Sequence, residues 1–312
     1  MSKMKSVTIV IPAYNESDCV DELAARLKRI FELEFNYEWS VILVENGSTD
    51  LTWSKLKIIA KNDDRFKVLK LSRNFRMDGG LTAGLDYVDS EACVLMSADL
   101  QDPPEMISQF LRKWEEGFEN IYGVIKKRKG TNVLRKINSV LFYKIAGKMT
   151  NRLIPENASD FRLVDRKVYE AVREMNERNR FVRGLFAWVG FKSIGIPMDR
   201  PERYAGKSNA DTFKVLELAI KGLFAHSYKP LRFISVAGLI ISFMSLVAII
   251  VLAVLAVFVG VPFAGFGTIV ALIIGGFGFQ TLLLGIVSEY LGLVYEESKG
   301  RPNFIVSEKI GF

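Results

Sequence analysis

Residues 94–105 read VLMSADLQDPPE, an apolar run that ends at a serine and is followed by acids, two prolines and a glutamate. The apolar run is typical of a buried strand, and a proline after a short loop is typical of the first turn of a helix. Asp99 and Asp102 are therefore expected between a strand and a helix, with the Asp102 charge facing the positive end of the helix dipole. A purely structural turn explains the same residues.

Strand-like and helix-like segments alternate over the first 125 residues. Short runs rich in Val and Ile predict strands, and the segments between them have helical patterns. The predicted strands are residues 7–12, 40–45, 66–71, 92–97 and 119–125, and the predicted helices are residues 17–32, 50–62, 79–88 and 104–117. This order predicts an α/β fold with a mainly parallel sheet, in which ligands bind beyond the carboxyl ends of the strands.

Polar residues collect in the loops that follow the first four predicted strands. These loops read PAYNES at 12–17, ENGSTD at 45–50, SRNFR at 72–76 and SADLQDPPE at 97–105. Two phosphate-binding fingerprints, G-x-G-x-x-G after the first strand and G-x-x-x-x-G-K-[ST], are missing. Carboxylates, amides and hydroxyls stand in their place, so we expect one site built from four loops.

The second loop suits a nucleoside. Glu45, Asn46 and Asp50 can form hydrogen bonds with a base edge and ribose hydroxyls. The alternative is a helix N-cap at Ser48 or Thr49, because serine and threonine side chains accept hydrogen bonds from the first helical amides.

The fourth loop suits a hard cation. Asp99 and Gln101 offer oxygen ligands, and Mg²⁺ takes one or two carboxylates and completes its shell with substrate phosphates and water. The small number of acids is thus compatible with a metal ion that bridges a diphosphate.

The composition changes sharply near the end of the chain. No Asp, Glu, Lys or Arg occurs from Phe233 to Ser288, a run of 56 residues. One membrane-spanning helix needs about 20 apolar residues, so the run predicts two spans, at residues 233–259 and 267–290. A very apolar pair of soluble helices is the alternative.

Lys and Arg flank both ends of this run and are absent from the predicted turn. Because these residues favour the cytoplasmic side, both chain ends are expected in the cytoplasm, and the two cysteines agree with a reducing compartment. The predicted organisation is a cytoplasmic catalytic domain at 1–210, a juxtamembrane amphipathic helix at 211–232, two transmembrane helices within 233–290 and a cytoplasmic C-terminal tail at 291–312.

The formal charge of +7 narrows the classes of partner. The charges after residue 230 cancel, so the surplus lies in residues 1–230 and suits an anionic membrane surface or a phosphate-bearing substrate. Zinc-finger spacings, helix-turn-helix patterns and aromatic-basic RNA motifs are missing, which argues against nucleic acid. The single histidine, His226, excludes a cluster of histidines as acid, base or metal site.

Two segments have the apolar stripe and basic residues of helices that lie in a membrane surface. They are residues 134–154 and residues 212–233, and the second runs directly into the first predicted span. Helices packed on the sheet are the alternative.

Several of these motifs resemble one enzyme family. PAYNE, ENGSTD, LSRNFR and ADLQDPPE resemble the family 2 inverting glycosyltransferases with a GT-A fold. Further along, SDFRLVDR at 159–166, RPERYAGKS at 200–208 and SEYLGLVYEESKGRP at 288–302 resemble the polyprenyl-phosphate branch. That branch includes dolichyl-phosphate mannose synthases and bacterial bactoprenol glucosyltransferases.

The resemblance implies a multi-pass enzyme of the bacterial inner membrane whose catalytic domain is cytoplasmic. It implies a UDP-linked hexose as donor, undecaprenyl phosphate as acceptor, Mg²⁺ or Mn²⁺ as cofactor, and a homo-oligomer such as a tetramer. A GDP-mannose-using enzyme similar to dolichyl-phosphate mannose synthases is one alternative. A catalytically weakened protein that serves as a partner or sensor is another.

The matched motifs also imply site residues. Donor binding is assigned to Pro12, Tyr14, Glu16, Glu45, Asn46, Ser72 and Asp99, metal binding to Asp99 and Gln101, and the acceptor phosphate to Arg200, Arg203, Lys207 and Ser208. Asp99 and Asp160 are the implied catalytic residues. Asp160 matches the family's base, although it can equally orient the acceptor or stabilise positive charge at the anomeric carbon; a helix cap or a partner of Arg162 are structural alternatives.

The chain departs from the family pattern at several acids. The family's D-A-D is Ser97-Ala98-Asp99, its D-D-G-S or N-D-G-S begins with Glu45-Asn46, and an acid of its later basic motif is Lys207. Metal binding is therefore expected to depend on Asp99, with Gln101 and the donor diphosphate. A strong base is hardly needed, because a phosphate monoester with a second pKa of about 6 is already an anion.

Overall fold

A computed structural model describes residues 4–126, 155, 157–178, 180–201 and 265–312, with single positions between 234 and 258. The chain divides into two compact units, Met1–Asp211 with Gly300–Phe312, and Thr212–Lys299. Each unit is described by itself.

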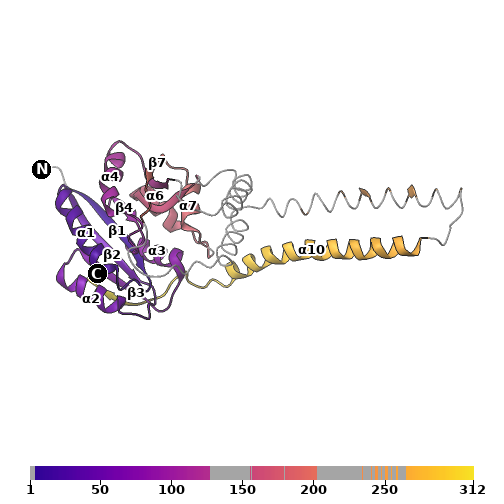
Figure 1. The fold of residues 1–312 in the computed structure, drawn as a ribbon, viewed down its shortest axis with the longest axis horizontal. Coiled ribbons are helices and arrows are strands. Elements are labelled where there is room, and N and C mark those ends of the chain that lie inside the picture. Colours follow the sequence, from indigo (N-terminus) through magenta and orange to yellow (C-terminus); the bar gives the residue numbers. More distant parts are fainter. Residues whose placement is uncertain are drawn as a thin grey trace. The chain divides into compact units, whose positions relative to one another are not determined.

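The first unit is built on one eight-stranded sheet of order β7-β5-β6-β4-β1-β2-β3-β8 (Figure 1). Its strands are β1 (Lys5–Ala13), β2 (Tyr37–Glu45), β3 (Phe66–Leu71), β4 (Ala92–Leu95), β5 (Asn120–Ile125), β6 (Ala158–Asp165), β7 (Ser193–Met198) and β8 (Val306–Ile310). Neighbours pair in parallel except at β4/β6, β5/β6 and β3/β8. The predicted α/β fold with a mainly parallel sheet is confirmed.

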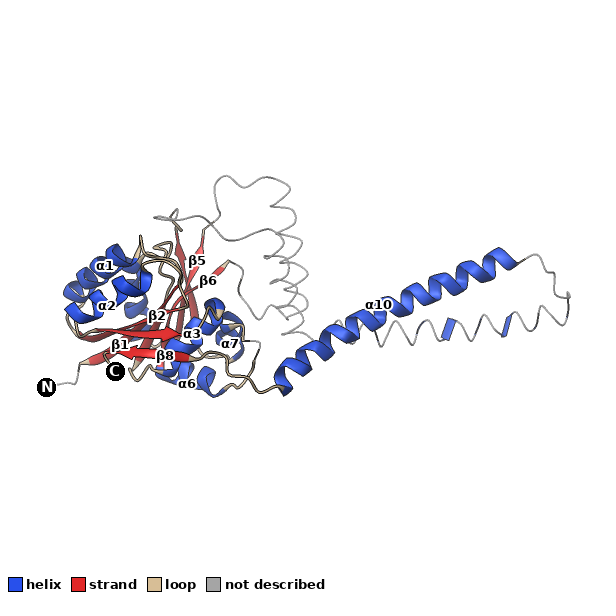
Figure 2. Cartoon of the chain, turned by 90° about the horizontal axis from the view of Figure 1, so that it is seen from below, coloured by secondary structure: helices blue, strands red, loops and turns tan. Residues whose placement is uncertain are grey.

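Helices cover both faces of this sheet, as Figure 2 shows. The helices are α1 (Val20–Leu33), α2 (Thr52–Asn62), α3 (Arg76–Asp86), the short η1 (Pro104–Met106), α4 (Ile107–Glu115), α6 (Arg166–Glu174) and α7 (Val182–Trp188). Buried residues of α1, α2 and α4 join one apolar cluster, and those of α3, α6 and α7 join a second cluster on the opposite face.

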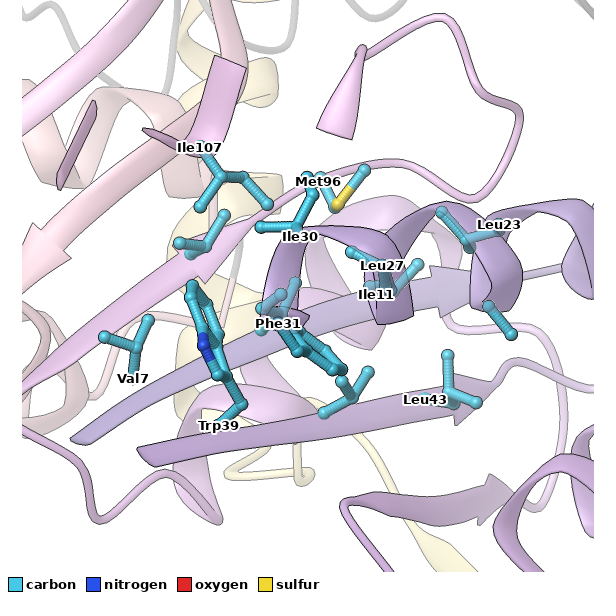
Figure 3. Close-up of a cluster of buried hydrophobic side chains, with 14 of the residues drawn as sticks. Val7, Ile11, Leu23, Leu27, Ile30, Phe31, Trp39, Leu43, Met96 and Ile107 are labelled. Carbon is cyan, nitrogen blue, oxygen red and sulfur yellow. The ribbon is translucent and has the colours of Figure 1, made fainter. Parts of the chain in front are cut away.

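The central strands are buried on both faces, which explains their continuous apolar runs. Successive side chains of a strand point to opposite faces, so Ile9 and Ile11 enter the first cluster and Val10 enters the second. In Figure 3, Leu27 and Phe31 of α1 lie over the strands that carry Ile11 and Trp39. Burial of these apolar surfaces is the main favourable contribution to the fold.

Glycines let α3 approach the sheet closely. A Cβ added at Gly84 would lie 2.2 Å from Val10 Cγ1, and one added at Gly80 would lie 2.8 Å from Pro12 Cβ. A side chain at either position would push α3 away from β1. The absence of side chains therefore brings the start of α3 against the end of β1, where the polar loops begin.

The C-terminal segment, predicted as a tail at residues 291–312, contains a strand of the sheet. Val306–Ile310 forms β8, which pairs antiparallel with β3. The Ser72 amide donates to the Ile305 carbonyl at 2.9 Å, and Lys70 forms an ion pair with Glu308 at 2.8 Å. The sequence VSEKI contains no apolar run because β8 is an edge strand with three exposed residues, and this is why it was not predicted.

The second unit contains α10 (Phe266–Ser298), which extends eight residues beyond the predicted end of the second span. The helix ends where Gly300 adopts a positive φ of 62°, a conformation that favours glycine at helix ends. Its segment Gly275–Ser298 is long and apolar enough to cross a membrane, by length and composition. Most of the first predicted span, and all of residues 127–154 and 202–233, lie outside the described residues, so the two-helix hairpin stays a prediction.

Candidate active site

The first, second and fourth polar loops leave the sheet at the same edge. Ala13 at the end of β1 pairs with Glu45 at the end of β2, and Val10 pairs with Leu95 at the end of β4. These three strands are parallel, so their carboxyl ends meet, as the sequence pattern predicts.

The first two loops are joined by direct hydrogen bonds. The Asn15 amide donates to Ser48 Oγ at 3.1 Å, and the Thr49 amide donates to Asn15 Oδ1 at 2.8 Å. The Ser17 amide donates to Asp50 Oδ2 at 3.2 Å. Much of the polar capacity of the ENGSTD loop is therefore used to hold the PAYNES loop. The alternative of a helix N-cap at Ser48 or Thr49 is wrong, because α2 begins at Thr52 with Leu51 as its N-cap.

Glu45 and Asn46 are buried in this framework, at 1% and 3% exposure. Asn46 Oδ1 accepts from the Phe75 amide at 2.9 Å, and its Nδ2 donates to the Arg76 carbonyl at 2.7 Å. Glu45 accepts from the Ser48 amide. Both side chains thus help to orient the loops, and the hydrogen bonds to base and ribose that the sequence suggests for them stay a prediction.

The third loop belongs to the same edge. Gly47 has φ of 73°, and a Cβ added to it would lie 2.5 Å from both the Arg73 carbonyl carbon and the Asn74 nitrogen. The backbones of the second and third loops therefore touch at a point where only glycine fits. This contact completes a rim of three loops.

The other predicted donor residues lie along this rim with different exposures. Pro12 is buried beneath α3, and Glu16 is half-buried. Tyr14 is 36% exposed, and Ser72 is exposed. The Tyr14 ring and the Ser72 hydroxyl are thus accessible from solvent in this arrangement.

Ser97 lies between two carboxylates in the fourth loop. Its Oγ is 2.7 Å from Asp99 Oδ1 and 2.7 Å from Asp102 Oδ2, and its amide donates to Asp102 Oδ2 at 3.0 Å. An aspartate in place of Ser97 would bring a third negative charge next to these two, which would raise the pKa values of the group. The serine therefore ties the loop together and limits its charge.

Asp102 directly precedes Pro103, the N-cap of η1, at the start of the helical segment that follows the loop. Its carboxylate accepts from Ser97, whereas η1 begins at Pro104 and α4 at Ile107. Burial to 2% exposure raises the pKa of Asp102, although the hydrogen bonds from Ser97 oppose this shift. Asp102 thus holds the loop together through Ser97, and its interaction with the helix dipole stays a prediction.

Asp99 and Gln101 have the chemistry of a magnesium or manganese site that a substrate completes. Asp99 is 5% exposed, and its Oδ1 accepts from the Gln101 amide at 3.1 Å. Among the described residues, no group of three or more His, Cys, Asp or Glu side chains is placed to hold a metal. One carboxylate and one amide oxygen fit a hard cation whose other ligands are a diphosphate and water.

Asp160 lies near the amino end of β6, the strand antiparallel to β4. The hydroxyl of Ser159, the residue before Asp160, lies 3.5 Å from Asp102 Oδ1, so the start of β6 reaches the fourth loop. Both carboxylate oxygens of Asp160 accept from Arg183 of α7, at 2.8 Å and 2.6 Å. The carboxylate of Asp160 is therefore paired with Arg183, a residue that lies in none of the motifs. Arg162 instead donates to the backbone carbonyl of Asp160, and the Asp160 side chain does not cap a helix.

The start of the basic loop reaches the fourth loop. Gln101 Nε2 donates to the Pro201 carbonyl at 3.4 Å, and the positive charge of Arg200 acts on both Asp102 and Asp160. Arg203, Lys207 and Ser208 lie outside the described residues.

Comparisons with known proteins agree with this arrangement. The family model "Glycosyl transferase family 2" matches residues 8–173. An uncharacterized glycosyltransferase of Synechocystis sp. is 39% identical over 98% of this chain and 96% of its own length. A prophage bactoprenol glucosyl transferase homolog of Escherichia coli is 31% identical over 96% of this chain and 98% of its own length.

A solved structure shows the same fold. Mannosyl-3-phosphoglycerate synthase from Rubrobacter xylanophilus aligns with a TM-score of 0.50 at 13% identity, over 72% of this chain and 74% of that chain. The family match spans most of the sheet and all four polar loops. The chain therefore belongs to glycosyl transferase family 2 and is a glycosyltransferase with a GT-A fold.

Proposed function

We propose that this glycosyltransferase moves a hexose, with inversion, from a UDP-sugar to a polyprenyl phosphate such as undecaprenyl phosphate. The observation that carries the proposal is the contact between the start of β6, which carries Asp160, and the fourth loop, which carries Asp99, with Arg200 acting on both segments. Near full-length similarity to proteins named bactoprenol glucosyl transferase, including one from Shigella phage SfV at 31% identity, supports the choice of acceptor.

The donor half of the site comprises the rim of loops and Asp99. The Tyr14 ring is open to a base, and aromatic faces stack on nucleobases. Asp99 and Gln101 would hold Mg²⁺ or Mn²⁺ against the donor diphosphate. When bound, the metal supplies positive charge that stabilises the departing diphosphate.

The acceptor half is assigned to Arg200 and, beyond the described residues, Arg203, Lys207 and Ser208. Arginine can hold phosphate oxygens with two parallel hydrogen bonds. Two anionic phosphates must approach each other during the transfer, and cations between them offset the repulsion. The position of Arg200 beside the fourth loop supports this division of the site.

The acceptor lipid places the reaction at a membrane, which we propose to be the bacterial inner membrane. Helix α10 provides one candidate span, and its described apolar side chains, such as Leu272, Phe277 and Leu291, are exposed in the single chain. The two-helix hairpin, a cytoplasmic catalytic domain and a homo-oligomer are parts of the same proposal.

A donor screen tests the proposal. The purified protein is incubated with undecaprenyl phosphate and Mn²⁺ or Mg²⁺, and with UDP-glucose, UDP-galactose, UDP-N-acetylglucosamine or GDP-mannose in separate reactions. We expect a lipid-linked hexose from one of the UDP-sugars, detected by mass spectrometry. A product from GDP-mannose alone would favour an enzyme similar to dolichyl-phosphate mannose synthases, and no product with any donor would favour a partner or sensor.

A further inference from the structure

Arg183 and Asp160 form a two-point ion pair at the edge of the sheet. Arg183 Nε donates to Asp160 Oδ1 at 2.8 Å, and Arg183 Nη2 donates to Asp160 Oδ2 at 2.6 Å. The parallel pair of bonds fixes the plane of the carboxylate, which a single bond would leave free to rotate. The Asp160 side chain is nevertheless 32% exposed, so a substrate can reach it.

Arg183 is held by a well-packed helix. Val182, Leu185 and Phe186 of α7 are all buried, at 1–2% exposure. The Val182 amide donates to Asp78 Oδ1 of α3 at 2.9 Å. The backbone that carries Arg183 is therefore held in place, and the guanidinium of Arg183 in turn orients the carboxylate of Asp160.

The surroundings of Asp160 favour its charged form. Burial raises the pKa of Asp160, but the hydrogen bonds and charge of Arg183 and the charges of Arg162 and Arg200 outweigh burial and lower it. Asp78 is the acidic group that faces this cluster from α3. Three arginines thus surround one half-exposed carboxylate.

We infer that Arg183 is a positioning residue that holds Asp160 as an oriented anion beside the reacting carbon, where Asp160 stabilises positive charge instead of accepting a proton. The inference rests on the proposed function. In that reaction an acceptor phosphate oxygen forms a bond with the anomeric carbon, and the bond from that carbon to the donor diphosphate breaks. The electron pair leaves with the nucleoside diphosphate, and no proton needs to move because the acceptor is already ionised.

The geometry disfavours a base. A general base needs a lone pair directed at the proton that it takes, and its pKa should be near the working pH. Each oxygen of Asp160 accepts one hydrogen bond from Arg183, and the neighbouring arginines lower the pKa of this carboxyl, which makes it a weak base. A fixed negative charge, by contrast, acts without breaking those bonds.

Substitutions of Arg183 separate these two roles. Arg183→Gln removes the positive charge and one of the two hydrogen bonds to Asp160. If Asp160 acts as an oriented anion, kcat should fall by about 10²-fold, which is typical of a misplaced catalytic group. The KM for the UDP-sugar should change little. Arg183→Lys keeps the charge and should retain more activity than Arg183→Gln. A base role predicts the reverse for Arg183→Gln, because a more basic carboxylate would maintain or raise kcat.

The kcat of each variant is then divided by the wild-type kcat at each pH between about 6.5 and 8.5. Because the acceptor phosphate ionises equally in both reactions, its ionisation does not affect this ratio. Loss of Arg183 removes one of the interactions that lower the pKa of Asp160, so the ratio for Arg183→Gln should be smallest at the acidic end of this range. Arg173→Gln is the matched control, because the Arg173 guanidinium on the same face of the sheet donates to the backbone carbonyls of Leu85 and Val88. Its ratio should stay constant with pH even where its Tm falls.

A double-mutant cycle based on Tm measures the coupling between Arg183 and Asp160 independently of enzyme activity. The Tm loss from Arg183→Gln should be smaller in an Asp160→Asn background than in the wild type. Coupling in the cycle with an unchanged kcat and pH ratio would overturn the positioning role. Coupling together with no sugar transfer by the wild type would overturn the proposed function and leave the ion pair established, whereas additive Tm losses would overturn the pair itself.

Discussion

Ser97 Oγ lies 2.7 Å from Asp99 Oδ1, at the position where the family pattern has an acid. The same hydroxyl lies 2.7 Å from Asp102 Oδ2, so it serves two carboxylates that would otherwise repel each other. The hydroxyl of Ser97 thus keeps the loop ordered while the loop carries one negative charge fewer than the family pattern.

Replacing Ser97 with aspartate should restore charge at the expense of order. Ser97→Asp is expected to tighten Mn²⁺ binding in the presence of UDP and to lower the Tm without metal, because three carboxylates then share one loop. Isothermal titration with Mn²⁺ and UDP, and thermal unfolding with EDTA, measure the two effects. Ser97→Ala is the control. It should lower the Tm but should not increase the affinity for Mn²⁺. Unchanged metal affinity and Tm in Ser97→Asp would place residue 97 outside the site.

Asp78 predicts a pH dependence of stability. Burial is the main reason that its pKa is raised to about 6. A raised pKa contributes stability that is complete below the unfolded value near 4 and is lost as the pH rises through about 6. Lowering the pH from about 7 to 4 should therefore stabilise the wild type relative to Asp78→Asn by up to about 2 kcal/mol. Urea unfolding in detergent at several pH values measures this difference, and parallel curves would contradict it.

The strand β8 predicts a link between the C-terminal segment and the donor loops. Removing residues 300–312 deletes the partner of β3 and the carbonyl that accepts from the Ser72 amide. We expect a lower Tm and weaker UDP binding, because the third loop loses its support. Glu308→Ala is the matched control: it removes only the exposed ion pair with Lys70, which is worth about 0–1 kcal/mol. Equal UDP affinity in the truncated and full chains would contradict the link.

The sequence predicted the elements whose pattern reflects burial. Strands β1 to β5 are recognisable because their apolar runs fill two clusters, and α1 because one face of it is apolar. Strand β6 was not predicted as an element, since Ser159, Asp160 and Arg162 interrupt its apolar residues. Those polar residues are buried or paired, which depends on contacts with segments distant in the sequence.

The site was predictable as a place and less so in its details. Loops at the ends of parallel strands identify the edge, but a polar residue looks the same whether it binds a ligand or another loop. Asn46, which the sequence assigns to nucleotide binding, also binds the Phe75 amide and the Arg76 carbonyl, and the sequence pattern does not show this second role. Arg183 lies in no motif, and only the fold brings it to Asp160.

The basic loop predicts a defect confined to the acceptor. Arg203→Lys keeps the charge but loses the two-point grip on phosphate, so the KM for undecaprenyl phosphate should rise while the affinity for the UDP-sugar stays nearly constant. Initial rates at varied acceptor and donor concentrations separate the two constants. A fall in donor affinity at constant acceptor KM would assign the loop to the nucleotide diphosphate instead.

Transfer of labelled hexose to undecaprenyl phosphate by the wild type, Asp99→Asn and Asp102→Asn tests the central claim most directly. Asp99 is the proposed metal ligand, and Asp102 is a buried fastener of the same loop. We predict labelled lipid from the wild type, none from Asp99→Asn, and a reduced amount from Asp102→Asn together with a lower Tm. Equal, mild losses in the two variants, or transfer by Asp99→Asn at the wild-type rate, would contradict the account.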